Sequence, residues 1–418
     1  MSRIRFRQVV PLSALVGVMV GLFGAAFYLV WHELEELVWE HLENPMHRIW
    51  VSGLIGLVIG LIIWKLWDPG TMGDIIGHFH HRGKLPMADN KPIIPISLVG
   101  LVGGSSAGPE GVLTQVCGTM GSWVAERFGH PDLVRVLTQA GMGAGFGAFL
   151  GAPVGGAMLW LEMPHKKGLE YFEALVPTIT CSVVGHLVMT TLLGINLMPT
   201  WHLPNFTPST RLDLVAAIGL GLVAGGAAIL YAKIFQAVGA GFRALPVPVW
   251  VKTTLAGLII GGLGAALPIT YFYGRQQITD VITGSFAMPM LIGILLAKML
   301  AAAVTIKGHW QGGLIIPHMF MGIVIGKAAA LALPGLNPTL AMVVCMAAFN
   351  AAATHTPLAS ALIVVALSGF GGIVPIFIAS LVGFFIGQRI ELIGNKSHRT
   401  EWPVLEMVRR PDLAAAGD

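Results

Sequence analysis

The sequence contains little charge and few cysteines. Charged side chains make up 11% of its 418 residues, whereas soluble domains carry roughly 25%, so a water-soluble fold is excluded. The three cysteines, Cys117, Cys181 and Cys345, lie in apolar runs without metal-ligand spacing, which argues against a disulfide framework or a zinc site. The longest polar stretches, about 68–91 and 196–211, are loop-sized, and no Walker A sequence occurs. We therefore expect neither a soluble domain nor ATP hydrolysis.

What the sequence does contain is a series of apolar segments separated by short polar ones. Hydrophobic residues make up 55% of the chain, and several segments reach the ~20 residues that a helix needs to cross a bilayer. Others are shorter and are interrupted by Gly or Pro. We predict an all-α polytopic membrane protein. Its apolar segments lie at about 9–31, 50–67, 92–104, 134–161, 174–193, 212–242, 251–267, 288–306, 315–333, 340–353, 358–372 and 375–390.

Both ends of the chain are basic. The first apolar segment is too long for a signal-peptide core and lacks a small-residue cleavage site, so we interpret it as a retained helix. Arg3, Arg5 and Arg7, together with the basic residues in 396–410, favour cytoplasmic positions for both termini. These flanks account for the net charge of +4, so no nucleic-acid partner is expected.

Two stretches of the sequence follow the same plan. "GPEG" begins at Gly108 and "GGLIIP" begins at Gly312, and each precedes a helix, a run of small residues and an X-Pro bond that opens another helix. The intervals from Gly108 to Pro153 and from Gly312 to Pro357 are both 45 residues. Broken segments at matching positions of two halves indicate a binding site near the membrane midplane, and free N–H groups at helix starts attract anions. The pattern favours an anion pathway over a chance agreement of spacing.

A carboxylate, Glu110, stands in the first of these glycine-rich breaks. A charge at bilayer depth is costly, and irregular backbone is tolerated there only inside protein or beside a water-filled path. The alternative is a solvated loop glutamate, against which the flanking apolar segments argue. We interpret Glu110 as a functional residue.

In this order and spacing, the motifs resemble the CLC family of chloride channels and chloride/proton antiporters. The family's Gly-Arg/Lys-Glu-Gly-Pro motif appears as Gly-Pro-Glu-Gly-Val at 108–112, and its Gly-x-Phe-x-Pro motif appears as Gly-Leu-Ile-Ile-Pro at 313–317. The small-residue run at 140–162 is similar to the family's Ala/Gly-rich helix with its Ala-Pro and closing acidic residue. The resemblance covers about 70–372 and implies a CLC-type fold with two inverted repeats and broken helices.

The resemblance also assigns roles to residues of both breaks. Glu110 resembles the gating glutamate, whose carboxylate occupies an anion site and moves away when it is protonated or displaced. Backbone N–H groups at the two helix starts are then expected to face the ion. The expected anion-binding residues are Gly108, Gly111, Gly313, Leu314 and Ile315.

The family's Gly-Ser-Gly-x-Pro motif has no exact counterpart in this chain. "PGTMGDI" stands in its place, so that either Thr71 or Met72 takes the position of the inner-site serine. Thr71 keeps a hydroxyl donor, whereas Met72 supplies a thioether, as in the fluoride-transporting branch of the family. That branch also carries a glutamate just after the second X-Pro, where this chain has Ala359 and Ser360. Chloride is therefore the expected substrate, and fluoride is the alternative.

The residues that carry protons in the family's antiporters are altered. Their intracellular glutamate, the second of a Glu-Glu pair after Ala-Pro, falls on Met163, and the first falls on Glu162. Both are candidates for a proton pathway; otherwise Glu162 is interpreted as a helix-end carboxylate meeting water or Lys166 and Lys167. The family's inner-gate tyrosine is missing, because all five tyrosines precede the second repeat's motifs. Loss of the relay favours passive conduction over coupled exchange, although channel and antiporter both stay open.

The chain, 1–418, is expected to form one transmembrane domain with a first repeat at about 10–200, a second at 210–393 and a cytoplasmic tail at 394–418. The resemblance implies a homodimer in a bacterial inner membrane, with one pathway per subunit. The expected partners are chloride or a related halide, protons in the antiporter case, and the lipid bilayer. No enzymatic activity, cofactor or metal is expected. The alternative of another class is a membrane protein that keeps the fold but has lost transport and serves a structural or sensing role.

Overall fold

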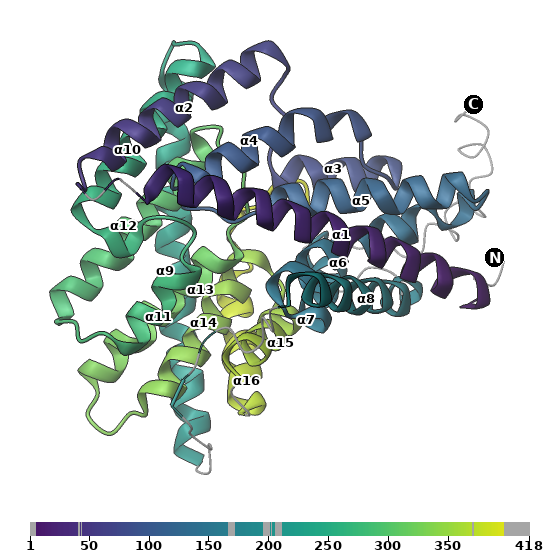
Figure 1. The fold of residues 1–418 in the computed structure, drawn as a ribbon. Helices are drawn as coiled ribbons and strands as arrows, with labels where there is room; N and C mark the ends of the chain where they lie inside the picture. The colour runs from purple at the N-terminus through teal and green to yellow at the C-terminus, as the bar shows by residue number, and fades with distance from the viewer. Residues whose placement is uncertain are drawn as a thin grey trace.

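The structure is a computed structural model that describes residues 6–40, 42, 44–165, 172–194, 201, 203–204, 211–369 and 372–396. Within these residues the chain is α-helical and has no β-strand (Figure 1). Four short 3₁₀ segments lie among the helices at Met87–Asp89, Pro131–Leu133, Phe172–Ala174 and Pro268–Thr270. The helices are α1 (Phe6–Trp39), α2 (His47–Lys65), α3 (Met72–Arg82), α4 (Asn90–Val102), α5 (Glu110–Arg127), α6 (Val134–Leu150), α7 (Pro153–Glu162), α8 (Leu175–Leu193), α9 (Arg211–Ala244), α10 (Val249–Ala266), α11 (Arg275–Thr283), α12 (Met288–Lys307), α13 (Ile315–Ala332), α14 (Pro338–Thr354), α15 (Pro357–Ser368) and α16 (Ile373–Gly387).

The prediction of an all-α polytopic membrane protein is confirmed. Eight helices of the described chain are long and apolar enough to cross a membrane, and α14, α15 and α16 are shorter apolar helices. The three cysteines are buried and free, as expected of small core residues. Residues 1–5 and 397–418, which carry most of the charges used to place the termini, lie outside the described residues.

The expectation that 68–91 is only a loop is wrong, because α3 forms inside it. Thr71 and Asp74 build a capping box at its start, in which the Asp74 carboxylate accepts the backbone N–H of Thr71 at 2.7 Å. Gly83 ends the helix in the left-handed conformation, with a φ of 66°. Local caps therefore make a helix from a segment too short and too polar to be recognised as a membrane span. Most of 196–211 lies outside the described residues.

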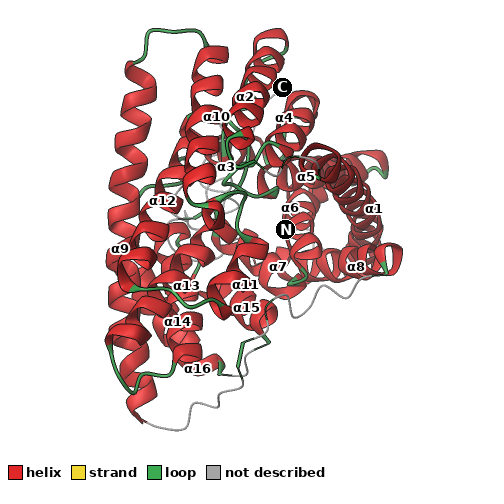
Figure 2. Cartoon of the chain, turned by 60° about the vertical axis from the view of Figure 1, so that its left-hand side comes forward, coloured by secondary structure: helices red, strands yellow, loops and turns green. Residues whose placement is uncertain are grey.

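The two halves repeat the same broken-helix geometry. Helices α6 and α14 each contain 17 residues, and each ends at a residue with positive φ, 76° at Gly151 and 60° at His355. Two residues later Pro153 opens α7 and Pro357 opens α15. Helices α7 and α15 pack against each other (Figure 2). The short helices of the two repeats therefore meet.

Small residues let the helices of each half approach closely. A Cβ on Gly141 of α6 would lie 2.1 Å from the carbonyl oxygen of Cys117 on α5. In the second half, a Cβ on Gly322 of α13 would lie 2.5 Å from the carbonyl oxygen of Cys345 on α14. Both distances are impossible for a real side chain, so glycine is required at both interfaces. This is the close backbone packing expected between helices in a membrane.

Candidate functional site

The two glycine-rich breaks meet directly. Gly108 N–H donates to the carbonyl of Gly313 at 2.8 Å, and Gly313 N–H donates to the carbonyl of Gly108 at 2.9 Å. The partner of Gly108 is therefore Gly313, one residue after the position that the repeat interval indicates. This pair of hydrogen bonds brings the start of α5 next to the start of α13. Two sets of helix-terminal N–H groups thus share one place in the protein.

Glu110 begins α5 and is buried at this junction, with 2% of its surface exposed. Both carboxylate oxygens are buried without a well-formed hydrogen bond, and the backbone N–H groups of Ile315 and Ile316 face them from the first turn of α13. A Cβ on Gly108 would lie 2.3 Å from Glu110 Oε2, and a Cβ on Gly313 would lie 2.4 Å from Glu110 Cβ. The carboxylate fits here only because both neighbours are glycine.

A cavity of about 440 Å³ extends from Glu110. The structure places most of the predicted site residues on its wall, from elements far apart in the sequence. Gly108, Gly111 and Glu162 do not line it, although Gly108 and Gly111 lie in the turn that holds Glu110. The predicted residues that line the cavity are Thr71, Met72, Glu110, Met163, Gly313, Leu314 and Ile315.

Basic side chains also line this cavity. Arg243, Lys252 and Lys307 contribute to its wall, and the Lys307 ammonium lies 4.3 Å from the centre of the Phe235 ring. We call these three cations the basic cluster. Three acidic side chains, Asp68, Asp74 and Glu110, line the same cavity. The basic cluster therefore offsets the carboxylates on the wall and lowers the electrostatic cost of bringing an anion into the cavity.

The carboxylate of Asp68 is held by its neighbours. Its Oδ2 lies 2.7 Å from His309 Nδ1, and its Oδ1 accepts the backbone N–H of Gly70 at 2.9 Å. Burial raises the pKa of Asp68, but the hydrogen bonds from His309 and Gly70 outweigh it, so the pKa lies below its usual value. Asp68 therefore stays charged and fixes the loop between α2 and α3.

The start of α3 brings both inner-site candidates to the cavity. The Thr71 hydroxyl donates to Asp74 Oδ2 at 2.9 Å, so its hydrogen is already used. Met72 is the first residue of α3, is half-buried, and packs against the main hydrophobic core. Of the two, Met72 is the one without a competing local hydrogen bond.

Glu162 is the last residue of α7, but the expectation that its carboxylate meets water is corrected. Its side chain is 4% exposed and accepts N–H groups from Leu358 at 3.1 Å and Ala359 at 2.8 Å. These donors belong to the first turn of α15, so Glu162 satisfies two N–H groups that the helix itself leaves unpaired. The close packing of α7 on α15 makes this contact. Lys166 and Lys167 lie outside the described residues.

Three cavity residues escaped notice in the sequence. Thr114, Trp160 and His318 line the cavity, and none is more than 1% exposed. Among the described residues, Thr114 Oγ1, Trp160 Nε1 and His318 Nε2 have no hydrogen-bond partner. Helical spacing was the available signal. Thr114 follows Glu110 by four residues and His318 follows Leu314 by four, so each lies on the same helix face as a residue of the break.

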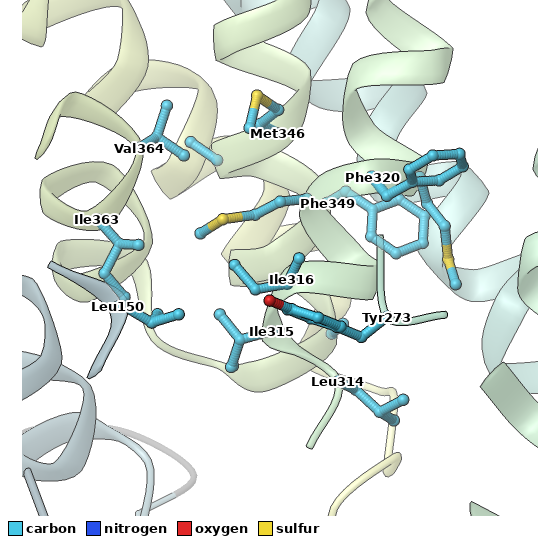
Figure 3. Close-up of a cluster of buried hydrophobic side chains, with 14 of the residues drawn as sticks. Leu150, Tyr273, Leu314, Ile315, Ile316, Phe320, Met346, Phe349, Ile363 and Val364 are labelled. Atoms are coloured by element: carbon cyan, nitrogen blue, oxygen red, sulfur yellow. The ribbon is translucent and has the colours of Figure 1, made fainter. Parts of the chain in front are cut away.

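Tyr273 is a further residue at this junction. It lies between α10 and α11, and Figure 3 shows its ring beside Ile315 and Ile316 with the hydroxyl directed toward them. Its hydroxyl bonds the Arg275 side chain and interacts electrostatically with Glu110. A tyrosine thus lies beside the start of α13, on an element other than the last helix.

Fold and site together define a class: an α-helical membrane protein of two inverted repeats whose broken helices meet at one buried carboxylate. The family described as "Voltage gated chloride channel" matches residues 73–388, well over half of the chain. The chain therefore belongs to this family, and the resemblance seen in its motifs is confirmed.

Known relatives and structures agree over nearly the whole length. The chain is 26% identical to the chloride/fluoride channel protein of Pseudomonas syringae pv. tomato, over 96% of this chain and 90% of the relative. It is 25% identical to the voltage-gated ClC-type chloride channel ClcB of Salmonella typhimurium, over 92% and 97%. A CLC-type fluoride/proton antiporter structure is similar with a TM-score of 0.84 and 20% identity, over 95% of this chain and 100% of that one. The structure of a slow cyanobacterial chloride/proton antiporter is similar with a TM-score of 0.79 and 21% identity, over 92% of this chain and 95% of that one. These structures support the CLC-type fold.

Proposed function

We propose that this protein carries a small inorganic anion, chloride in the first place, through the cavity that ends at Glu110. The observation that carries the proposal is a buried carboxylate that has no well-formed hydrogen bond within the described residues and is faced by N–H groups at the starts of two helices. Helix starts favour anions, so Glu110 occupies a place suited to the transported ion. When the carboxylate leaves, the anion takes that place.

Burial supports the role of Glu110 as a gate. An isolated buried carboxylate is costly, and this cost is reduced either by protonation or by movement toward water. Gating through Glu110 then responds to both pH and anion concentration. The gate role and the anion-binding roles of Gly108, Gly111, Gly313, Leu314, Ile315, Thr71 and Met72 are part of this proposal.

Anion efflux from liposomes that contain the purified protein tests the proposal. Wild-type protein is expected to release chloride, and Glu110→Gln, which resembles the protonated carboxylate, is expected to remove the pH dependence of that release. Protein-free liposomes give the background. Absence of both chloride and fluoride efflux from a folded protein would contradict transport and favour a structural or sensing role.

Fluoride is the second candidate, because Met72 lines the cavity at the start of α3 while the Thr71 hydroxyl is bound to Asp74. A relative of this chain is named as a chloride/fluoride channel. The ratio of fluoride to chloride efflux decides between the two. A Met72→Ser variant with an unchanged ratio would exclude Met72 as the selecting residue.

Proton coupling is proposed to be weak or absent along the usual route. Met163, which lines the cavity, cannot carry a proton, and Glu162 is engaged with the start of α15. A chloride gradient that drives no proton movement would support passive conduction. Clear proton pumping would instead require another titratable group beside the cavity. A homodimer in a bacterial inner membrane, with both termini cytoplasmic, completes the proposal from the family resemblance.

A further inference from the structure

His318 stands where the start of α13 meets the cavity. It is the fourth residue of the helix, fully buried, and it lines the cavity together with Leu314 and Ile315. Its ring contacts Tyr231, with centroids 5.6 Å apart, and Phe349, with centroids 5.8 Å apart. Its Nδ1 lies 3.3 Å from Asn350 Oδ1, and its Nε2 has no hydrogen-bond partner in the part of the chain that the structure describes. One nitrogen of the ring therefore faces α14, and the other is buried without a partner in a residue that lines the cavity.

A chain of buried hydrogen bonds fixes which nitrogen carries the hydrogen. Thr354 Oγ1 donates its hydrogen to the backbone carbonyl oxygen of Asn350 at 2.6 Å. In its 2.6 Å contact with Thr356 Oγ1, Thr354 Oγ1 can therefore only accept a hydrogen. Thr356 has then used its hydrogen and accepts from Ser360 Oγ at 3.3 Å. Ser360 in turn accepts from Asn350 Nδ2 at 2.8 Å. Asn350 Oδ1 therefore faces His318, and His318 Nδ1 must carry the hydrogen.

The neutral ring thus has a bare lone pair at Nε2. A lone pair repels an anion, whereas a proton on Nε2 supplies both a donor and a positive charge. Thr114 and Trp160 line the same cavity, and Thr114 Oγ1 and Trp160 Nε1 likewise have no hydrogen-bond partner among the described residues. An anion beside His318 is bound well only when Nε2 has taken up a proton.

We propose that His318 is a proton-coupled ligand of the transported anion, whose Nε2 takes a proton from cavity water as the anion binds and releases it as the anion leaves. This inference rests on the proposed anion pathway and adds a titrating group to it that is separate from Glu110. The net charge entering with each anion is cancelled by the proton, which lowers the cost of holding an anion in a buried site.

Other titratable groups act on His318 from several elements. Lys396, in the segment after α16, opposes its protonation electrostatically, whereas Glu110 lines the same cavity with a negative charge. Tyr231 of α9 contacts the ring as a neutral phenol. The remaining titratable groups around α13 lie farther along the helix. The Lys298 ammonium of α12 lies over the Phe320 ring, and Cys345 of α14 packs beside Gly322. The Lys327 ammonium bonds backbone carbonyls at the end of α11.

The test measures chloride affinity by calorimetry in detergent between pH 5 and 8, with fluoride as the second probe and Glu110→Gln as the background. With Glu110 unable to titrate, the Kd for chloride is expected to rise up to tenfold per pH unit above the pKa of His318, with matching proton uptake in weak buffer. His318→Asn, which keeps a donor toward Asn350 but has no atom at Nε2, is expected to lose this slope. His318→Gln, a permanently neutral group, is expected to lose it as well.

Asn350→Asp tests the coupling without changing the histidine. A carboxylate beside Nδ1 stabilises the imidazolium, so the pH dependence is expected to shift upward by about one unit or more. A histidine that only packs would leave the slope unchanged in all three variants, and that result would overturn the inference. If the Glu110→Gln protein binds neither anion at any pH, the proposed function itself fails. Binding with a Kd independent of pH defeats only the role of His318.

Discussion

Replacing Gly108 by alanine is expected to open the gate without breaking the fold. The new Cβ would lie 2.3 Å from Glu110 Oε2, whereas carbon and oxygen atoms normally approach no closer than about 3.4 Å. The clashing atom is the end of a flexible side chain, so the carboxylate moves rather than the backbone. Overpacking of this kind costs about 1–3 kcal/mol. The closed position of Glu110 is then expected to lose population by about 5- to 150-fold relative to the open one.

Chloride efflux from liposomes measures this change. Gly108→Ala is expected to release chloride faster than wild type at neutral pH and to respond less to pH. Gly262→Ala is the control, because its new Cβ meets no other described part of the chain within 4 Å beyond the adjacent backbone of its own helix. In a Glu110→Ala background the clash disappears, so adding Gly108→Ala is expected to have no further effect. A folded Gly108→Ala protein with wild-type efflux and pH response would refute the closed position of the carboxylate as the barrier.

Three further predictions concern stability. Gly141→Ala forces a Cβ to 2.1 Å from a backbone carbonyl of α5, so we expect it to lower the free energy of unfolding by at least about 3 kcal/mol or to prevent folding. Thermal unfolding in detergent measures this against Gly262→Ala, and equal melting temperatures of the two variants would contradict the packing. Glu162→Ala removes the acceptor for two N–H groups at the start of α15 and is expected to lower stability by about 1–2 kcal/mol, whereas Glu162→Gln keeps an acceptor and is expected to leave any proton coupling unchanged; abolished coupling would restore Glu162 as a relay. Burial lowers the pKa of Lys396 to about 7, against the opposing attraction of Glu162. Because the unfolded lysine titrates near about 10.4, the unfolded state binds more protons between pH 7 and 10, so stability is expected to rise with pH there. Lys396→Met is expected to flatten that rise, and an unchanged slope would count against a buried amine at this position.

The sequence predicts the broken helices well, because glycine and proline mark them. The X-Pro bonds at Pro153 and Pro357 start α7 and α15. The apolar run at 134–161 divides into α6 and α7 at Gly151, whose positive φ ends the first helix. Glu110 is recognisable in the sequence because it is an isolated charge between apolar segments, and the structure places it on the wall of the cavity.

Contacts between segments far apart in the sequence could not be predicted from these local patterns. The pairing of Gly108 with Gly313, one residue from the repeat interval, depends on how two turns fit together. The capping of α15 by Glu162 depends on the packing of α7 against it. Tyr273 is brought to Ile315 and Ile316 by the segment between α10 and α11. The hydrogen-bond chain that ends at His318 uses ordinary Ser, Thr and Asn residues, whose sequence pattern resembles that of any buried helix.

The central claim is that Glu110 occupies a place that belongs to the transported anion. Anomalous diffraction from crystals grown in bromide tests this most directly, with the wild-type and Glu110→Gln proteins compared under one condition. The account predicts a bromide peak in the variant at the position of the wild-type carboxylate, within about 3.5 Å of the N–H groups of Ile315 and Ile316. A variant structure with bromide elsewhere in the cavity and none at the starts of α5 and α13 would contradict it.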